Sequence, residues 1–70
     1  MATVRFELEG DYVELNQLLK LVGLCGSGGI GKQIVASGAV SVDGRQELRK
    51  TAKIRAGQPV SVDDVTITVA

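Results

Sequence analysis

Apolar residues alternate with polar ones near both ends of the chain and recur with a longer period between them. In the segment from Thr3 to Leu8, the apolar residues Val4 and Phe6 share a face with Leu8, which is the pattern of a half-buried β-strand. The same period of two recurs in three later segments, at residues 39–42, 60–62 and 65–69. The dipeptide Lys53-Ile54 begins another extended piece. The pattern therefore predicts four strands, or five if this piece also pairs.

A first helix is predicted from about Val13 to Val22. Its apolar stripe consists of residues spaced three or four apart, which are Leu15, Leu18, Leu19 and Val22. Asn16 and Lys20 lie four residues apart, and we expect them together on the outer face of this helix.

A second helix is predicted from about Gly28 to Ser37. The hydroxyl of Ser27 can accept a bond from a free amide of the first turn, and Gly38 can end the helix in the left-handed conformation. Three glycines stand in the opening turn: Gly28, Gly29 and Gly31. Each lowers the stability of the helix by up to about 1 kcal/mol relative to alanine. Close approach of a ligand to bare backbone is one reason to keep them.

The dipeptide Asp43-Gly44 follows an apolar run and predicts a tight turn of a β-hairpin. A two-residue turn would pair Val42 with Arg45 and Val40 with Glu47. The apolar face does not continue past the turn, so the sequence leaves the register of the returning strand open.

Strands segregated from a pair of helices indicate an α+β fold, in the order β-α-α-β-β-β. Residues 45–53 contain only Leu48 and Ala52 as apolar positions, so we expect a mostly exposed, basic connection there. The length of 70 residues allows one small domain, which we expect to span residues 1–70.

The chain has one cysteine, Cys25, and no histidine. It therefore lacks an internal disulfide, the usual ligands of a zinc site and a base to activate the thiol. The N-terminal carboxylates lack the spacing of a calcium loop. We expect no metal, no cofactor and no catalytic residue. No apolar run approaches the roughly 20 residues that span a membrane, and no secretion signal is evident, so we expect a cytoplasmic protein without a membrane partner.

Charge is unevenly distributed, although the net charge is zero. Residues 1–14 carry one basic and four acidic side chains, and residues 56–70 carry two aspartates. Residues 15–55 carry seven basic side chains against two acidic ones. A basic centre between acidic ends suggests an anionic partner for the centre, whereas an ordinary solvated face is the alternative.

The segment GSGGIGKQ at residues 26–33 fits the beginning of a phosphate-binding P-loop. Gln33 stands where that motif needs a serine or threonine to hold magnesium, and the segment follows a predicted helix instead of a strand. We therefore expect no nucleotide cofactor and treat a nucleotide-binding enzyme as a rejected alternative. Exposed amides at a helix start, together with Lys32, still suit an anion.

Phe6 and Tyr12 are the only aromatic residues of the chain. This scarcity argues against recognition of single strands by base stacking. It favours contacts with the phosphates and 2′-hydroxyls of RNA.

Three stretches of the chain resemble a known family. These are LLKLVGL, SGGIGKQIVASGAVSVDGRQELRK and KIRAGQPVSV, within residues 13–62. They are similar to the RNA-binding domain first described in small-subunit ribosomal protein four, called the S-four domain below. The form most similar is a stand-alone, ribosome-associated bacterial one. The most specific parts are the serine opening the second helix, the I-x-x-x-G-x-V-x-V-D-G run at 34–44 and the K-I-x-x-G run at 53–57.

The resemblance implies the alpha-L RNA-binding motif fold, in which two short packed helices lie against a small, mostly antiparallel sheet. It also implies non-catalytic binding of structured RNA, such as ribosomal RNA, and a link to the ribosome. Carried over by position, the RNA-binding residues are Ser27, Gly28, Gly29, Lys32, Arg45, Arg49, Lys50 and Lys53. Weaker candidates are Lys20, Gln33 and Arg55.

Three positions depart from the stand-alone form. Ile30 removes a glutamate that could complete a capping box, Gly31 replaces a better helix former, and Asp43 places a negative charge within the expected surface. With a net charge of zero, these departures suggest modest affinity. The alternative function is a protein-interaction or regulatory domain that keeps the fold without binding RNA.

Overall fold

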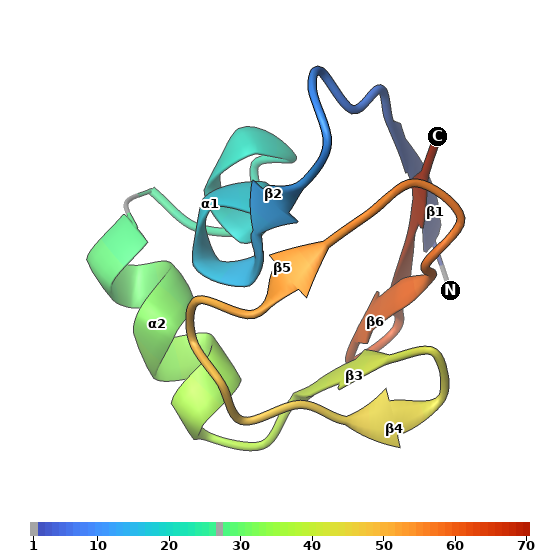
Figure 1. Ribbon diagram of the computed structural model, residues 1–70. Coiled ribbons are helices and arrows are strands. Elements are labelled where there is room, and N and C mark those ends of the chain that lie inside the picture. The colour runs from blue at the N-terminus through green and yellow to red at the C-terminus, as the bar shows by residue number, and fades with distance from the viewer. Residues whose placement is uncertain (1, 27) are drawn as a thin grey trace.

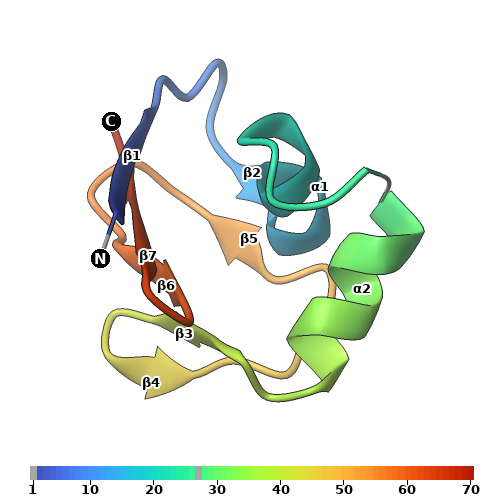
Figure 2. The same ribbon diagram turned by 180° about the vertical axis from the view of Figure 1, so that it is seen from behind.

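The computed structural model describes residues 2–26 and 28–70, which form seven strands and two helices (Figure 1). In chain order they are β1 (Ala2–Phe6), β2 (Val13–Glu14), α1 (Leu15–Leu21), α2 (Gly28–Ala36), β3 (Val40–Val42), β4 (Arg45–Gln46), β5 (Lys53–Ile54), β6 (Val60–Val62) and β7 (Val65–Val69). The two helices pack together beside the larger sheet, and Figure 2 shows the same arrangement from behind. The predicted α+β fold is confirmed.

The larger sheet has five strands in the order β1-β7-β6-β3-β4. Strand β1 runs parallel to β7, and the remaining neighbours are antiparallel, so the sheet is mostly antiparallel as expected. The short strands β2 and β5 form a separate antiparallel pair, so Lys53–Ile54 is the extra strand that the pattern had left open.

The β3–β4 hairpin has the register of a two-residue turn, which the sequence had left open. Val42 is paired with Arg45, and the N–H of Glu47 donates to the C=O of Val40 at 2.9 Å. The turn residue Asp43 has a φ of 54° and Gly44 a φ of 79°. Both are left-handed, as a two-residue turn that matches the twist of its strands requires.

The first helix is shorter than predicted. It begins at Leu15, because Val13 and Glu14 are extended and pair with β5. The N–H groups of Leu15 and Asn16 donate to the C=O groups of Ala52 and Lys50, at 2.9 and 3.1 Å. The 50–52 segment thus satisfies amides that a helix start leaves without an intrahelical partner. The prediction of helix at Val13 was wrong, because Val13 pairs with Ile54, a residue too distant in the sequence for a local pattern to reveal.

The second helix ends as predicted, at Ala36 followed by Gly38 with a φ of 85°. The predicted cap, Ser27, lies outside the described residues.

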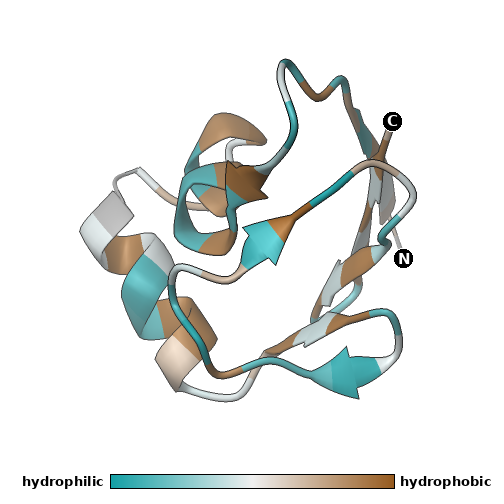
Figure 3. Cartoon of the chain, in the orientation of Figure 1, coloured by the Kyte–Doolittle hydropathy of each residue, from teal (hydrophilic) through white to brown (hydrophobic). Residues whose placement is uncertain are grey.

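The core lies between the helix pair and the sheet. Eleven buried apolar side chains among the described residues form it: Leu15, Leu18, Leu19, Val35, Val40, Ala52, Ile54, Val60, Val62, Ile67 and Val69. Figure 3 shows the apolar residues of the sheet strands in brown, whereas β4 is teal and α2 carries a teal stretch at mid-helix. The predicted stripe of α1 is therefore confirmed at three of its four positions, while Val22 is half-buried at the edge.

Asn16 does not lie on the outer face of α1, because it is only 2% exposed and faces α2. A Cβ placed on Gly31 of α2 would lie 2.7 Å from the backbone C=O of Asn16. Such a distance is too short for ordinary carbon–oxygen contact, so the two helices approach this closely only because residue 31 lacks a side chain. Gly31 therefore serves helix packing, and the explanation by ligand approach is not needed for it.

Candidate nucleic-acid interface

The second helix presents its beginning and one polar side to solvent. Gly28 and Gly29 form its start, and no acidic residue stands in its first turn. Lys32 and Gln33 are exposed, whereas Val35 is buried. The start of a helix carries a partial positive charge, to which Lys32 adds a full one. This arrangement suits an anion such as phosphate.

Asn16 links the second helix to the connection that follows β4. Its backbone C=O lies against Gly31, and its N–H donates to the C=O of Lys50 at 3.1 Å. Lys32 follows Gly31 directly, so the backbones that carry Lys32 and Lys50 both adjoin Asn16. Both lysines are exposed. The fold thus brings together two cations that are 18 positions apart in the sequence.

The β3–β4 hairpin is held against the end of α2. The side-chain amide of Gln46 donates to the C=O of Gly38 at 3.0 Å. This contact places Arg45, exposed on the edge strand β4, on an element that adjoins α2. The sequence analysis missed the role of Gln46, because no local pattern connects it to a helix end eight residues earlier.

Arg49 is exposed but is not a free cation. Its guanidinium binds the Glu47 carboxylate through two bonds, Nη2 to Oε1 at 2.9 Å and Nε to Oε2 at 3.1 Å. The side-chain bond, followed by the bond from the Arg49 N–H, holds the pKa of the Glu47 carboxyl below its usual value. Glu47 is thus ionised at neutral pH and compensates the charge of Arg49. In an extended segment, side chains two residues apart share a side, which is the signal that could have revealed this pair.

Lys53, Arg55 and Lys20 are all exposed, but on different elements. The Lys53 ammonium lies 4.9 Å from the centre of the Tyr12 ring, within cation–π range. Arg55 follows β5, and its backbone N–H donates to the Gln58 side chain at 2.7 Å. Lys20 stands in the last turn of α1, at the opposite end of that helix from the Lys50 backbone. Lys20 thus lies about one turn of helix beyond Asn16, to which the Lys50 backbone is bonded.

The turn residue Asp43 is held by Gln58. The Gln58 amide donates to Oδ2 of Asp43 at 3.0 Å, and the Asp43 N–H donates to the C=O of Pro59 at 3.0 Å. An amide satisfies a carboxylate without neutralising it, so the negative charge persists beside Arg45. Gln58 was also missed by the sequence analysis, because its partner lies 15 residues away.

Five exposed cations thus lie on adjoining elements, and we call them the basic surface: Lys32, Arg45, Arg49, Lys50 and Lys53. Residues 28–33 of the glycine-rich segment belong to α2, and the element that precedes α2 is the helix α1, which is not the strand-to-helix context of a P-loop. Within the described part of the chain, no three His, Cys, Asp or Glu side chains are grouped to hold a metal ion. No helix of that part has the length and apolar character needed to cross a membrane.

Replacing Glu47 with glutamine is expected to raise the affinity for RNA about two- to fivefold, because the exposed Arg49 would be released from its ion pair. Glu7→Gln is the control for net charge, since Glu7 also pairs with an arginine, Arg5 at 2.8 Å, although the Glu7 side chain is 73% exposed and that of Glu47 only 18%. Titration of a labelled RNA hairpin measures both. An equal gain from both variants would mean that only net charge had changed.

Three comparisons relate the chain to known proteins. It is 54% identical over 50 residues to the Escherichia coli (strain K12) protein named "Putative RNA-binding protein YbcJ", a match covering 71% of each chain. It is equally similar to the "Uncharacterized protein YbcJ" of Shigella flexneri. Among solved structures it is similar to that of YbcJ from E. coli, described as revealing an ALFAL motif involved in RNA-binding. That match has a TM-score of 0.70 and 44% identity and covers 100% of this chain and 87% of the other.

The family model of the S4 domain, the S-four domain named above, matches residues 6–70. This match spans every element except most of β1, and it includes all five cations of the basic surface. Together with the relatives, it shows that the chain belongs to the S4 domain family.

Proposed function

We propose that this protein binds structured RNA, without catalysis, through the start of α2, the β3–β4 turn and the connection between β4 and β5. The observation that carries the proposal is the basic surface. All five cations are exposed. Asn16 joins the backbones next to Lys32 and Lys50, and Gln46 holds the hairpin that carries Arg45 against the end of α2. Exposed cations suit phosphates, which supply most of the affinity of proteins for nucleic acids.

Contacts with the backbone of a folded RNA fit this surface better than base stacking does. Tyr12 is 43% exposed and lies beneath Lys53, while Phe6 is half-buried against the core. Protein side chains recognise double-stranded RNA mainly by its shape, through phosphate and 2′-hydroxyl contacts. The RNA-binding descriptions of YbcJ and its ALFAL motif support the same class of partner. We propose ribosomal RNA as the target. The protein would bind it within the ribosome.

The test is a titration of two labelled RNAs, a hairpin fragment of ribosomal RNA and an unstructured strand of equal length, over a series of salt concentrations. Three to five phosphate contacts predict a slope of about −2 to −4.5 for log affinity against log salt, at about 0.7–0.9 for each contact. The hairpin is expected to bind more tightly. A flat slope, or tighter binding of the unstructured strand, would overturn the proposal.

A further inference from the structure

An apolar groove lies at the end of the molecule opposite the β3–β4 hairpin. Its apolar lining consists of Phe6, Leu8, Tyr12, Val13 and Leu21. The segment between β1 and β2 forms its floor, and in Figures 1 and 2 this segment and the hairpin occupy opposite ends of the fold. The volume of about 330 Å³ is at the lower end of the roughly 300–1,000 Å³ of ligand pockets. The groove therefore has room for a small apolar group.

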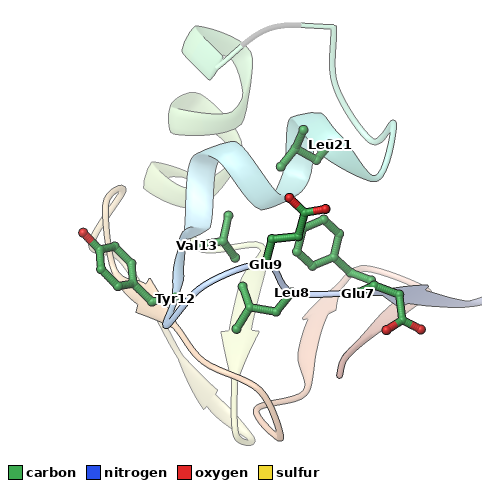
Figure 4. Close-up of a pocket in the computed structure, with 7 residues that line it drawn as sticks. Glu7, Leu8, Glu9, Tyr12, Val13 and Leu21 are labelled. Carbon is green, nitrogen blue, oxygen red and sulfur yellow. The ribbon is translucent and has the colours of Figure 1, made fainter.

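Two of the side chains that line the groove are largely exposed to solvent. Leu21 is 60% exposed and Tyr12 is 43% exposed, although both are large apolar side chains. Figure 4 shows Leu21 on the α1 side, Val13 and Leu8 facing each other in the middle, and Tyr12 at the far end. Tyrosine is enriched in protein interfaces, whose buried centres are more apolar than the rest of the protein surface. A groove open along one side encloses a free small molecule poorly, but it can receive a side chain from another protein.

The carboxylate of Glu9 lies at one end of this groove (Figure 4). In Figure 4 the Glu9 side chain extends toward Leu21, whereas Glu7 points the other way. Glu7 is paired with Arg5 at 2.8 Å, and Glu9 has no ion-pair partner in the described ranges. Lys53, over the Tyr12 ring, is the cation at the other end. The Leu21 end of the groove therefore carries a carboxylate, and the Tyr12 end carries a cation.

We propose that this groove docks a segment of a partner protein in which a large apolar residue is flanked by lysine or arginine. The apolar side chain enters between Leu21, Leu8 and Val13, and the basic neighbour pairs with Glu9. Charge complementarity selects this occupant, because an acidic segment, or RNA itself, would be repelled by the Glu9 carboxylate at the Leu21 end (Figure 4). Lys53 of the basic surface lies over the Tyr12 ring at one end of this site, and Leu21 and Glu9 lie at the other (Figure 4). The protein would therefore hold RNA on the basic surface and a basic protein segment at the Leu21 end of the groove.

The test is selection of phage-displayed random 12-residue peptides on the immobilised full chain. We expect enrichment of peptides with a large apolar residue next to lysine or arginine. Leu21→Ser is expected to weaken the selected peptides about tenfold or more, as loss of a central apolar contact does. Glu9→Gln should weaken them about two- to fivefold. Leu48→Ser is the matched control, because Leu48 is 55% exposed on the connection after β4 and should leave binding unchanged.

The expected result also includes retention of RNA affinity by Leu21→Ser, with unchanged circular dichroism. Several outcomes would overturn the proposal: no enrichment, enrichment of acidic peptides, or binding that Leu21→Ser does not weaken. Sedimentation of the free protein tests the remaining alternative, in which a second copy of this chain occupies the groove. A dimer that Leu21→Ser dissociates would assign the groove to a second copy of this chain and also overturn the proposal.

Discussion

Replacing Gly31 with alanine is expected to lower the free energy of unfolding by about 1–2 kcal/mol. The new methyl group would lie 2.7 Å from the C=O of Asn16, which belongs to the backbone of α1 and cannot rotate away. Overpacking of this kind costs about 1–3 kcal/mol, and the better helix propensity of alanine returns up to about 1 kcal/mol. In a chain of 70 residues, with a total stability of roughly 4–10 kcal/mol, such a loss is readily measured by urea unfolding.

The matched control is Gly26→Ala. A Cβ at Gly26 meets no atom within 4 Å, and its φ is outside the left-handed region. Its free energy of unfolding should change by no more than about 0.5 kcal/mol. If Gly31→Ala proved as stable as the original protein, the helices would have room to separate, and the glycine would need the explanation by ligand approach after all.

The sequence predicts the sheet well where the signal is local. Alternation predicts β1, β3, β6 and β7, and the dipeptide Asp43-Gly44 predicts the hairpin. Each of these depends on residues adjacent along the chain. The register past the turn stayed open because the apolar face ends there, and the structure shows that Val42 pairs with Arg45 although Arg45 is polar.

The errors concern residues whose environment is set by distant parts of the chain. Helical periodicity places Asn16 opposite the apolar stripe, but α2 and the 50–52 segment cover that face. The side-chain Oδ1 of Asn16 is buried and has no hydrogen-bond partner among the described residues, which no amphipathic pattern would predict. Similarly, Val13 fits a helix by its period but pairs with Ile54.

The candidate site shows the same division. The sequence identified the cations, and the resemblance to the S-four domain indicated which of them lie on the RNA-binding face. Neither revealed that Glu47 binds Arg49 or that Gln58 binds Asp43. These contacts change the expected contribution of each cation, since a paired arginine must exchange its partner to bind phosphate. Lys32 and Lys50, for which no ion pair occurs among residues 2–26 and 28–70, are therefore the better targets for mutation.

Reversing the charge of both Lys32 and Lys50 is expected to weaken RNA binding about 100-fold or more. Hydrogen bonds to charged groups are worth about 1.5–3 kcal/mol, and each 1.4 kcal/mol corresponds to a factor of ten in affinity. Each single variant, Lys32→Glu or Lys50→Glu, should thus lose about tenfold. The slope of log affinity against log salt should also fall by about 0.7–0.9 for each lost phosphate contact. Titration of the ribosomal RNA hairpin over the salt series measures both quantities.

Arg5→Glu is the matched control, because it changes the net charge as much as either single variant but lies on β1, outside the basic surface. It is expected to weaken binding less than threefold, because charges farther apart than the Debye length of about 8–10 Å are largely screened. Since Lys32 and Lys50 are exposed, their reversal should leave the urea midpoint nearly unchanged. Equal losses from Arg5→Glu and Lys32→Glu, with equal slopes, would mean that RNA responds only to net charge. The basic surface would then have no special role, and the interface would have to be sought on another face of the fold.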